Sequence, residues 1–250
     1  MQMSSSLPQT IDKEFNPDRI SHVKKYDIFL FDADNTLFDY DKAEENALKI
    51  VFDNCGFTYS ESIRLKYREI NLKIWEDYEK GIITKTDLQP ARFNKLFEEI
   101  GVTYDAKIFN DKYLAELGKG SFLIDGALEI CQKIAFNKKL IFLVTNGILA
   151  TQKARIEHSI IKDYISDFFV SEFVGFQKPH ISYFDYVFSH IPQTEKSKII
   201  IIGDSLTADI AGGNNAGIDT CWFNGSGKTN DTDILPVYEI NKLDELNVFV

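Results

Sequence analysis

Short apolar runs that alternate with helical segments are the feature of this sequence that most constrains its fold. Such runs occur in "YDIFLF", "KLIFLV", "DFFV", "KIIIIG" and "DTCWF". They are too short to cross a membrane, and their length is typical of buried strands. From about residue 121 onward, stretches with apolar residues at helical spacing separate these runs: residues 125–137, 150–159, 181–190 and 207–216. The pattern predicts an α/β fold with a doubly wound, Rossmann-like parallel sheet that helices cover on both faces.

An all-helical stretch interrupts the alternation after the first strand. Its apolar spacing predicts four helices, and no convincing strand occurs among them: residues 42–55, 60–80, 84–101 and 105–120. We therefore expect a small helical cap domain over residues 42–119, inserted into a catalytic core that consists of residues 23–41 and 120–250. Residues 1–22 form a polar N-terminal extension in which no chemistry is evident.

Charge and cysteine content narrow the partners and the compartment. The formal net charge is −10, and no block of Lys or Arg stands out, so polymeric nucleic acid and membrane surfaces are not expected partners. A small anionic substrate is compatible with this charge if a local cation offsets it. The three cysteines lack metal-ligand spacing, and the N-terminus lacks the apolar segment of a signal peptide. These features predict reduced thiols and a cytoplasmic protein.

Polar side chains follow the predicted strands at the points where the strands end. In parallel sheets, ligands bind beyond the carboxyl ends of the strands. Each residue alone is also common in turns and helix caps, but together they form a set suited to phosphoryl transfer. The set comprises Asp32 and Asp34 after the first strand, Thr145 and Asn146 after the second, Lys178 in a later loop, and Asp204, Ser205 and Asp209 after "KIIIIG".

The spacing of Asp32 and Asp34 requires an explanation, because residues two apart on a strand project to the same face. Two adjacent carboxylates repel each other unless a cation relieves the pair. Mg²⁺ takes oxygen ligands and needs only one or two carboxylates beside phosphate and water. Asp32 and Asp204 are suited to that task, and a carboxylate nucleophile with Lys and hydroxyl donors suits in-line attack on phosphorus.

These motifs, in this order, resemble the four motifs of the haloacid dehalogenase superfamily. Asp-x-Asp-x-Thr starts at Asp32, Thr-Asn at Thr145, Lys-Pro at Lys178, and Gly-Asp-Ser contains Asp204. The resemblance covers about residues 23–250 and implies an Mg²⁺-dependent enzyme that works through an aspartyl-phosphate intermediate. It implies that Asp32 is the nucleophile and that Asp34 is the general acid and base.

The same resemblance implies roles for the remaining motif residues. Thr145 and Asn146 would bind the phosphoryl group together with Lys178, which would also hold Asp32. Asp32 and Asp204 would ligate Mg²⁺ with the backbone carbonyl of Asp34. Asp209 and Ser205 would lie around these ligands.

A closer resemblance is to the YjjG/YfnB-type pyrimidine 5′-nucleotidase branch. The segments that carry it are "LFDADNTLFDYD", "NLKIWEDYEKGIITKTDLQPARF", "VSEFVGFQKP" and "NAGIDTCWFN". Asn35 replaces the glycine usual in the superfamily and the acid of this branch, with no expected loss of chemistry. The branch implies hydrolysis of nucleoside 5′-monophosphates, foremost pyrimidine and deoxy nucleotides, and extends to modified bases.

Several alternatives stay open at this point. A phosphatase of another metabolite, such as a sugar phosphate or phosphoglycolate, or a sugar phosphomutase would use the same residues. A haloacid dehalogenase shares the nucleophile, but it releases halide without a proton donor, which leaves Asp34 without a use. A phospho-accepting receiver-like domain also gathers Asp, Thr and Lys at strand ends, but the helical insert favours a capped enzyme.

The cap offers candidates for substrate recognition. Trp75 and Tyr78 lie three apart on one predicted helix, and Arg92 and Phe93 lie on the next. In one interpretation, Trp75 and Phe93 pack as cap core, as aromatic residues at helical spacing usually do. In the other, Tyr78 or Arg92 reaches the crevice and contacts the base or the ribose.

Overall fold

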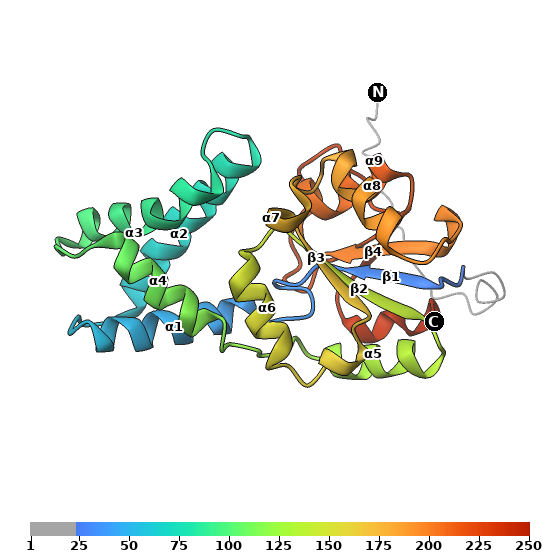
Figure 1. Cartoon of the computed structure of the whole chain (residues 1–250), viewed down its shortest axis with the longest axis horizontal. Coiled ribbons are helices and arrows are strands. Elements are labelled where there is room, and N and C mark those ends of the chain that lie inside the picture. The colour runs from blue at the N-terminus through green and yellow to red at the C-terminus, as the bar shows by residue number, and fades with distance from the viewer. Residues whose placement is uncertain (1–23) are drawn as a thin grey trace, which may run out of the picture.

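A six-stranded parallel sheet and the helices that flank it form the larger part of the molecule (Figure 1). The computed structural model describes residues 24–250, so the predicted extension over residues 1–22 lies outside the described residues. The strands are ordered β3-β2-β1-β4-β5-β6 and all pair in parallel. Their bounds are β1 Ile28–Phe31, β2 Leu140–Thr145, β3 Asp167–Val170, β4 Ile199–Gly203, β5 Asp219–Phe223 and β6 Tyr238–Ile240. This arrangement confirms the predicted α/β fold.

Helices precede or follow each of the first five strands, as the alternating pattern predicts. In the core they are α5 Ala127–Phe136, α6 Leu149–Glu157, α7 Ser171–Val174, α8 Ile181–His190 and α9 Ala211–Ala216. A π-helical turn, Leu206–Ile210, leads directly into α9, and 3₁₀ turns occupy Lys162–Tyr164, Lys196–Lys198 and Leu243–Val248.

Alternate residues of the strands build a separate apolar layer on each face of the sheet. Phe29 and Phe31 of β1 belong to the layer that α5 and the C-terminal 3₁₀ turn cover. Ile28 and Leu30 belong to the opposite layer, which α8 covers. Because successive side chains of a strand point to opposite faces, a run of apolar residues is buried on both sides. The polar groups of the site are therefore left at the ends of the strands.

Four helices between β1 and β2 form the cap, which lies beside the carboxyl edge of the sheet (Figure 1). They are α1 Tyr40–Asn54, α2 Glu61–Glu79, α3 Lys85–Ile100 and α4 Ala106–Leu117, and their N-caps are Asp39, Ser60, Thr84 and Asp105. Their buried faces form one apolar cluster with Phe52, Phe93 and Phe109 inside. Phe93 is thus cap core, and Trp75 packs against that core while partly buried. We retain residues 42–119 as the proposed cap.

Candidate active site

The predicted site residues converge because three neighbouring strands end at the same level. Phe31 of β1 lies opposite Leu143 of β2 and Ile202 of β4. The next residue, Asp32, continues the pairing, since its N–H donates to the Ile202 carbonyl at 2.8 Å. The side chains that follow β1, β2 and β4 therefore meet at one edge, as expected for the carboxyl ends of parallel strands.

Lys178 lies at the centre of this edge. Its Nζ donates to Asp32 Oδ1 at 2.7 Å, to Asp209 Oδ1 at 2.6 Å and to the Val144 carbonyl at 2.6 Å. The side chain is 1% exposed, so these three acceptors replace its hydration. The loop between α7 and α8 thus places one buried cation beside the nucleophile candidate, which is the contact that the family resemblance implies.

Burial and charge act in opposite directions on this pair. Burial raises the pKa of Asp32 well above its usual range, Lys178 opposes this, and the carboxylates of Asp209 and Asp204 add to the rise. Burial alone would lower the pKa of Lys178, but Asp209 and Asp32 outweigh it and raise that pKa. Lys178 is therefore a cation, and one cation faces several carboxylates.

The carboxylates of Asp32, Asp204 and Asp209 form a cluster that could hold a cation. Each offers an oxygen, and these oxygens lie within 4.8 Å of one another. Burial, followed by the charge of Asp209, raises the pKa of Asp204 to about 7. The geometry sets these three carboxylates beside a single lysine, Lys178. Oxygen donors with excess negative charge fit a hard divalent ion such as Mg²⁺.

Asp209 and Ser205 serve mainly to support this cluster. Asp209 gives one oxygen to Lys178, and its Oδ2 accepts from the Ser205 N–H at 3.1 Å. Ser205 Oγ accepts from the Ala208 N–H at 3.1 Å and so caps the π-helical turn that carries Asp209. A side chain at Gly203 would place its Cβ 2.2 Å from Asp209 Oδ2, so this close approach requires glycine.

Asp34 makes a separate set of contacts. Its Oδ2 accepts from Gln152 Nε2 at 2.5 Å, and its Oδ1 is ion-paired with Arg155 Nη1. Both partners come from α6, and Arg155 is fully buried. Neither residue was expected from the sequence. Their spacing of three on the helix after Thr145-Asn146 was the signal that could have indicated a polar helix face toward the strand ends.

Thr145 and Asn146 shape the loop after β2. Thr145 is buried, and its Oγ1 accepts from the Gly147 N–H at 3.0 Å. The Asn146 side chain accepts from the Lys178 N–H and donates to the Lys178 carbonyl, each at 2.9 Å. Asn146 therefore fixes the loop of Lys178 with its side chain, and its backbone N–H is the group that we propose for the phosphate.

The cap contacts this loop through Lys85, a third residue that was not expected from the sequence. Lys85 Nζ donates to the Asn146 carbonyl at 2.6 Å and to Ser171 Oγ at 2.7 Å. The ring centroid of Tyr78 lies 5.1 Å from the same Nζ. Burial lowers the pKa of Lys85 to about 8. In the sequence, Lys85 is one of several lysines near helix ends, and only the tertiary contact distinguishes it.

The two predicted specificity residues differ in their surroundings. Tyr78 is half-buried, and its carbonyl accepts from Gln177 Nε2 of the Lys178 loop at 3.4 Å. Arg92 is 1% exposed and donates to Asn110 Oδ1 at 2.8 Å and to Asn71 Oδ1 at 3.3 Å. It also lines a cavity of about 30 Å³ that Asp34 and Trp75 share. Tyr78 thus lies at the cap–core contact, and Arg92 lies in the cap interior next to it.

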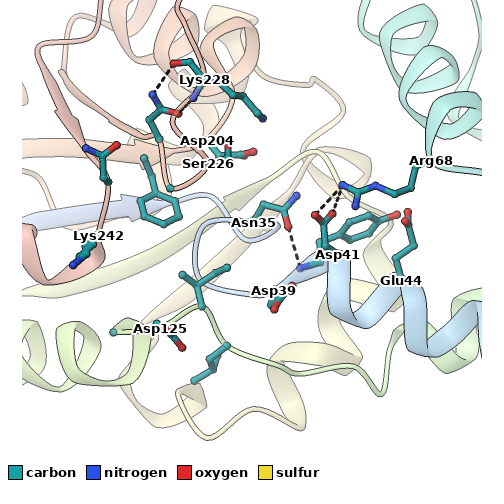
Figure 2. Close-up of a pocket in the computed structure, with 18 of the residues that line it drawn as sticks. Asn35, Asp39, Asp41, Glu44, Arg68, Asp125, Asp204, Ser226, Lys228 and Lys242 are labelled. Atoms are coloured by element: carbon teal, nitrogen blue, oxygen red, sulfur yellow. Dashed lines mark hydrogen bonds and ion pairs between the residues drawn. The ribbon is translucent and has the colours of Figure 1, made fainter. Parts of the chain in front are cut away.

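A cleft of about 970 Å³ opens between cap and core beside Asp204 (Figure 2). The core contributes Asp204 and the loop with Ser226 and Lys228, and the cap contributes Glu44 and Arg68. A cleft of this size accommodates a small metabolite.

Asn35 lines this cleft, and its backbone conformation explains why an asparagine is tolerated at this position. Its φ of 57° lies in the left-handed region, which asparagine adopts more readily than most residues. Its Oδ1 accepts from the Tyr40 N–H at 3.1 Å, as the dashed line in Figure 2 marks. The contact connects the turn after Asp34 to the start of α1.

Residues 29–223 match the haloacid dehalogenase-like hydrolase family. The chain belongs to this family. A similar relative is the HAD-hydrolase YfnB of Bacillus subtilis, 41% identical over 90% of this chain and 95% of YfnB. Its crystal structure, described as bound to magnesium and showing interdomain movement, matches with a TM-score of 0.85 over 89% of this chain and 97% of that chain.

Two further relatives are pyrimidine 5′-nucleotidases. PynA of Streptococcus pneumoniae is 34% identical over 88% of this chain and 93% of its own length. YjjG of Escherichia coli is 32% identical over 89% of this chain and 96% of its own length. The predicted family and branch resemblance are thus confirmed, and the chain is a hydrolase of the haloacid dehalogenase type with an acidic site at Asp32, Asp204 and Asp209. Within residues 24–250, no helix is both long and apolar enough to cross a membrane.

Proposed function

We propose that this protein is an Mg²⁺-dependent phosphomonoester hydrolase that acts on nucleoside 5′-monophosphates, with Asp32 as nucleophile. The observation that carries the reaction class is the contact of Lys178 with both Asp32 and Asp209, at 2.7 and 2.6 Å. A buried carboxylate beside one lysine and an acidic cluster is arranged to attack a group that carries negative charge.

In the first step, a carboxylate oxygen of Asp32 forms a bond to phosphorus while the bond to the leaving ribose oxygen breaks. Asp34 gives a proton to that oxygen, so the alcohol leaves neutral. Lys178 and the Thr145 hydroxyl, with the backbone N–H of Asn146, are the donors that we propose for the phosphoryl oxygens.

In the second step, water attacks the phosphorus of the aspartyl phosphate. Asp34, now ionised, takes a proton from this water as its oxygen bonds to phosphorus, and the bond to Asp32 breaks. Inorganic phosphate leaves, and Asp32 regains its carboxylate. One water is consumed per turnover, and each residue returns to its first state.

Asp32 and Asp204, with the backbone carbonyl of Asp34, are the groups that we propose to hold Mg²⁺. The excess of carboxylates over the one lysine, Lys178, supports this assignment. When bound, Mg²⁺ supplies positive charge that offsets the carboxylates and the phosphate. Asp209 and Ser205 support the cluster through the contacts described above.

The nucleotide specificity rests on the identity of 32–34% with the pyrimidine 5′-nucleotidases YjjG and PynA. We propose that Tyr78 and Arg92 contact the base or the ribose. Arg92 lines the same small cavity as Asp34, and Tyr78 lies at the contact between cap and core, whereas neither residue lines the large cleft beside Asp204. We also propose a cytoplasmic location, which the free thiols of Cys131 and Cys221 support.

A substrate panel tests this proposal. Phosphate release is measured with Mg²⁺ on pyrimidine and purine nucleoside 5′-monophosphates, sugar phosphates, phosphoglycolate and p-nitrophenyl phosphate. Pyrimidine nucleotides are expected to give the highest kcat/KM, and EDTA is expected to abolish release. Preference for a sugar phosphate would reject the nucleotidase assignment and keep the reaction class. Halide release from a 2-haloacid without phosphatase activity would reject both.

A further inference from the structure

Arg155 connects the proposed acid and base to both linkers between cap and core. The chain enters the cap through residues 32–39 and leaves it through residues 118–126. These linkers pair with each other, because the Asp39 N–H donates to the Phe122 carbonyl at 3.0 Å and Phe38 forms a bridge with Leu123. Arg155 contacts one linker through the Phe38 ring, whose centroid lies 4.9 Å from its Cζ. It contacts the other through the Gly120 carbonyl, which accepts from Nε at 3.1 Å.

The same guanidinium is ion-paired with Asp34 through Nη1. One planar group thus fixes three partners at once, and a planar fork keeps their relative directions. Gln152 completes the arrangement by donating to the other oxygen of Asp34. Both carboxylate oxygens are therefore oriented from α6, a helix of the core.

The Gly120 end of this connection has little freedom. A Cβ at Gly120 would lie 2.7 Å from the Ala43 Cβ of α1, so the exit linker packs closely against the first cap helix. A shift of the cap would therefore move Gly120, and its carbonyl is a hydrogen-bond partner of Arg155. Arg155 Nη2 and Gln152 Oε1 have no partner among the described residues and are buried beside the cap.

We propose that Arg155 and Gln152 are positioning residues that hold the Asp34 carboxylate for proton transfer and couple its direction to the position of the cap. This inference rests on the proposed function, because it assigns a task to the pair within that reaction. A fully buried arginine is also a structural element, since it packs on Phe38 and forms an ion pair with the partly exposed carboxylate of Asp34. A comparison of substrates with different leaving groups distinguishes the positioning role from the structural role, because only the positioning role predicts a loss that depends on the leaving group.

The experiment compares Arg155→Gln and Arg155→Lys with the wild-type enzyme on a nucleotide and on p-nitrophenyl phosphate. A ribose oxygen needs a proton to leave, whereas nitrophenolate does not. Arg155→Gln is expected to lose about 10- to 100-fold in kcat on the nucleotide, as misplaced catalytic groups do. On p-nitrophenyl phosphate it should keep a rapid nitrophenol burst and then turn over slowly, because only the second step needs Asp34. Arg155→Lys keeps the positive charge but lacks the planar guanidinium. Its kcat on the nucleotide should therefore lie between those of the wild type and Arg155→Gln.

A double variant tests whether the effect passes through Asp34. If it does, Arg155→Gln combined with Asp34→Asn should be no more than about 3-fold slower than Asp34→Asn alone. Lys153→Gln, on the exposed face of the same helix, is the matched control and should match wild type. Gln152→Met, which removes one hydrogen bond to Asp34, should show the same selective loss and serves if Arg155→Gln does not fold.

Two outcomes would overturn the inference. In the first, the soluble Gln152 and Arg155 variants lose the nitrophenol burst and the steady-state rate to the same extent. In the second, the loss caused by Arg155→Gln multiplies fully with the loss caused by Asp34→Asn in the double variant. A wild-type enzyme without Mg²⁺-dependent phosphate release would instead reject the proposed function. The two failures are therefore distinguishable.

Discussion

The Lys178 ammonium lies 2.6 Å from Asp209 Oδ1, and each of the two side chains is only 1% exposed. Asp32 shares the same ammonium. Removing one partner of a buried ion pair strands the other, which costs far more than removing the pair. Lys178 is therefore expected to stabilise the fold as well as to serve the chemistry that we propose.

We expect Lys178→Met to lower the free energy of unfolding by about 3–5 kcal/mol at neutral pH, because two buried carboxylates lose their cation. Activity should fall by at least about 100-fold, the usual cost of one electrostatic donor. Urea unfolding and phosphate release are the measurements. Lys95→Met, on an exposed cap position, is the control. A stable but inactive Lys178→Met protein would mean that the carboxylates are compensated by another group.

Phosphoryl-group analogues bound together with Mg²⁺ test the acidic cluster. Beryllium fluoride or vanadate with Mg²⁺ should raise the melting temperature, because both mimic a phosphoryl group at Asp32. The shift should be lost in Asp204→Ala, which lacks a proposed metal ligand. Ca²⁺ should support activity poorly, since it prefers more ligands at longer distances. A thermal shift that persists in Asp204→Ala would place the ion elsewhere.

Glu44 of α1 predicts a pH dependence of stability. Its side chain is 1% exposed, and burial, only partly offset by Arg68, raises its pKa to about 7. The folded protein therefore holds this proton when the unfolded chain, with an ordinary pKa, has lost it. The stabilisation is complete below the unfolded pKa and is lost as pH rises through about 7, at up to about 1.4 kcal/mol per pH unit.

Glu44→Gln should flatten this part of the profile, because a glutamine does not titrate. Urea unfolding from pH 4.5 to 7.5, with metal absent, measures it. Glu98→Gln, on an exposed face of the cap, is the matched control and should keep the wild-type slope. A slope in Glu44→Gln equal to that of the wild type would assign the pH dependence to other groups.

The sequence predicted the residues at strand ends well, and the reason is physical. An apolar run between helices identifies a buried strand, and parallel strands bring their carboxyl ends together. Asp32, Thr145 and Asp204 could be placed near one another on this rule alone, whereas the position of Lys178, in the loop before α8, came from the family resemblance. Strand β6, in contrast, could not be predicted from an apolar run. It has only three residues, of which Ile240 is buried and Glu239 is exposed.

Arg155 and Lys85 are residues whose role could not be predicted from the sequence. In the sequence both read as charged residues of helices, for which solvent exposure is the usual expectation. Their burial follows from tertiary contacts: Arg155 packs between α6 and the linkers, and Lys85 reaches from the cap to the carbonyl of Asn146. Such contacts join segments far apart in the chain, and local patterns carry no information on them.

The cap residues Tyr78 and Arg92 should respond differently to truncation. Tyr78→Ala is expected to raise KM for a nucleotide about 10-fold and to leave turnover of p-nitrophenyl phosphate unchanged, since that substrate has no base to contact. Arg92→Ala should also lower the melting temperature, because its guanidinium is hydrogen-bonded inside the cap to Asn71 and Asn110. Equal loss on both substrates for Tyr78→Ala would indicate packing instead of recognition.

Asp32 and Asp34 should be chemically unequal although they are two residues apart. Asp32→Asn cannot form an acyl phosphate, so it should show neither turnover nor a burst. Asp34→Asn should lose about 10²–10⁴-fold on a nucleotide, the usual contribution of a general acid and base. On p-nitrophenyl phosphate, the same variant should still form the intermediate, because nitrophenolate leaves without a proton.

Rapid mixing of Asp34→Asn with p-nitrophenyl phosphate measures this difference. The expected trace is a nitrophenol burst of about one equivalent per enzyme followed by a slow phase, with phosphate trapped on Asp32. Acid quench and mass spectrometry should find the added phosphoryl group in Asp34→Asn and none in Asp32→Asn. A burst in Asp32→Asn, or equal losses on both substrates in Asp34→Asn, would reverse or reject the assignment.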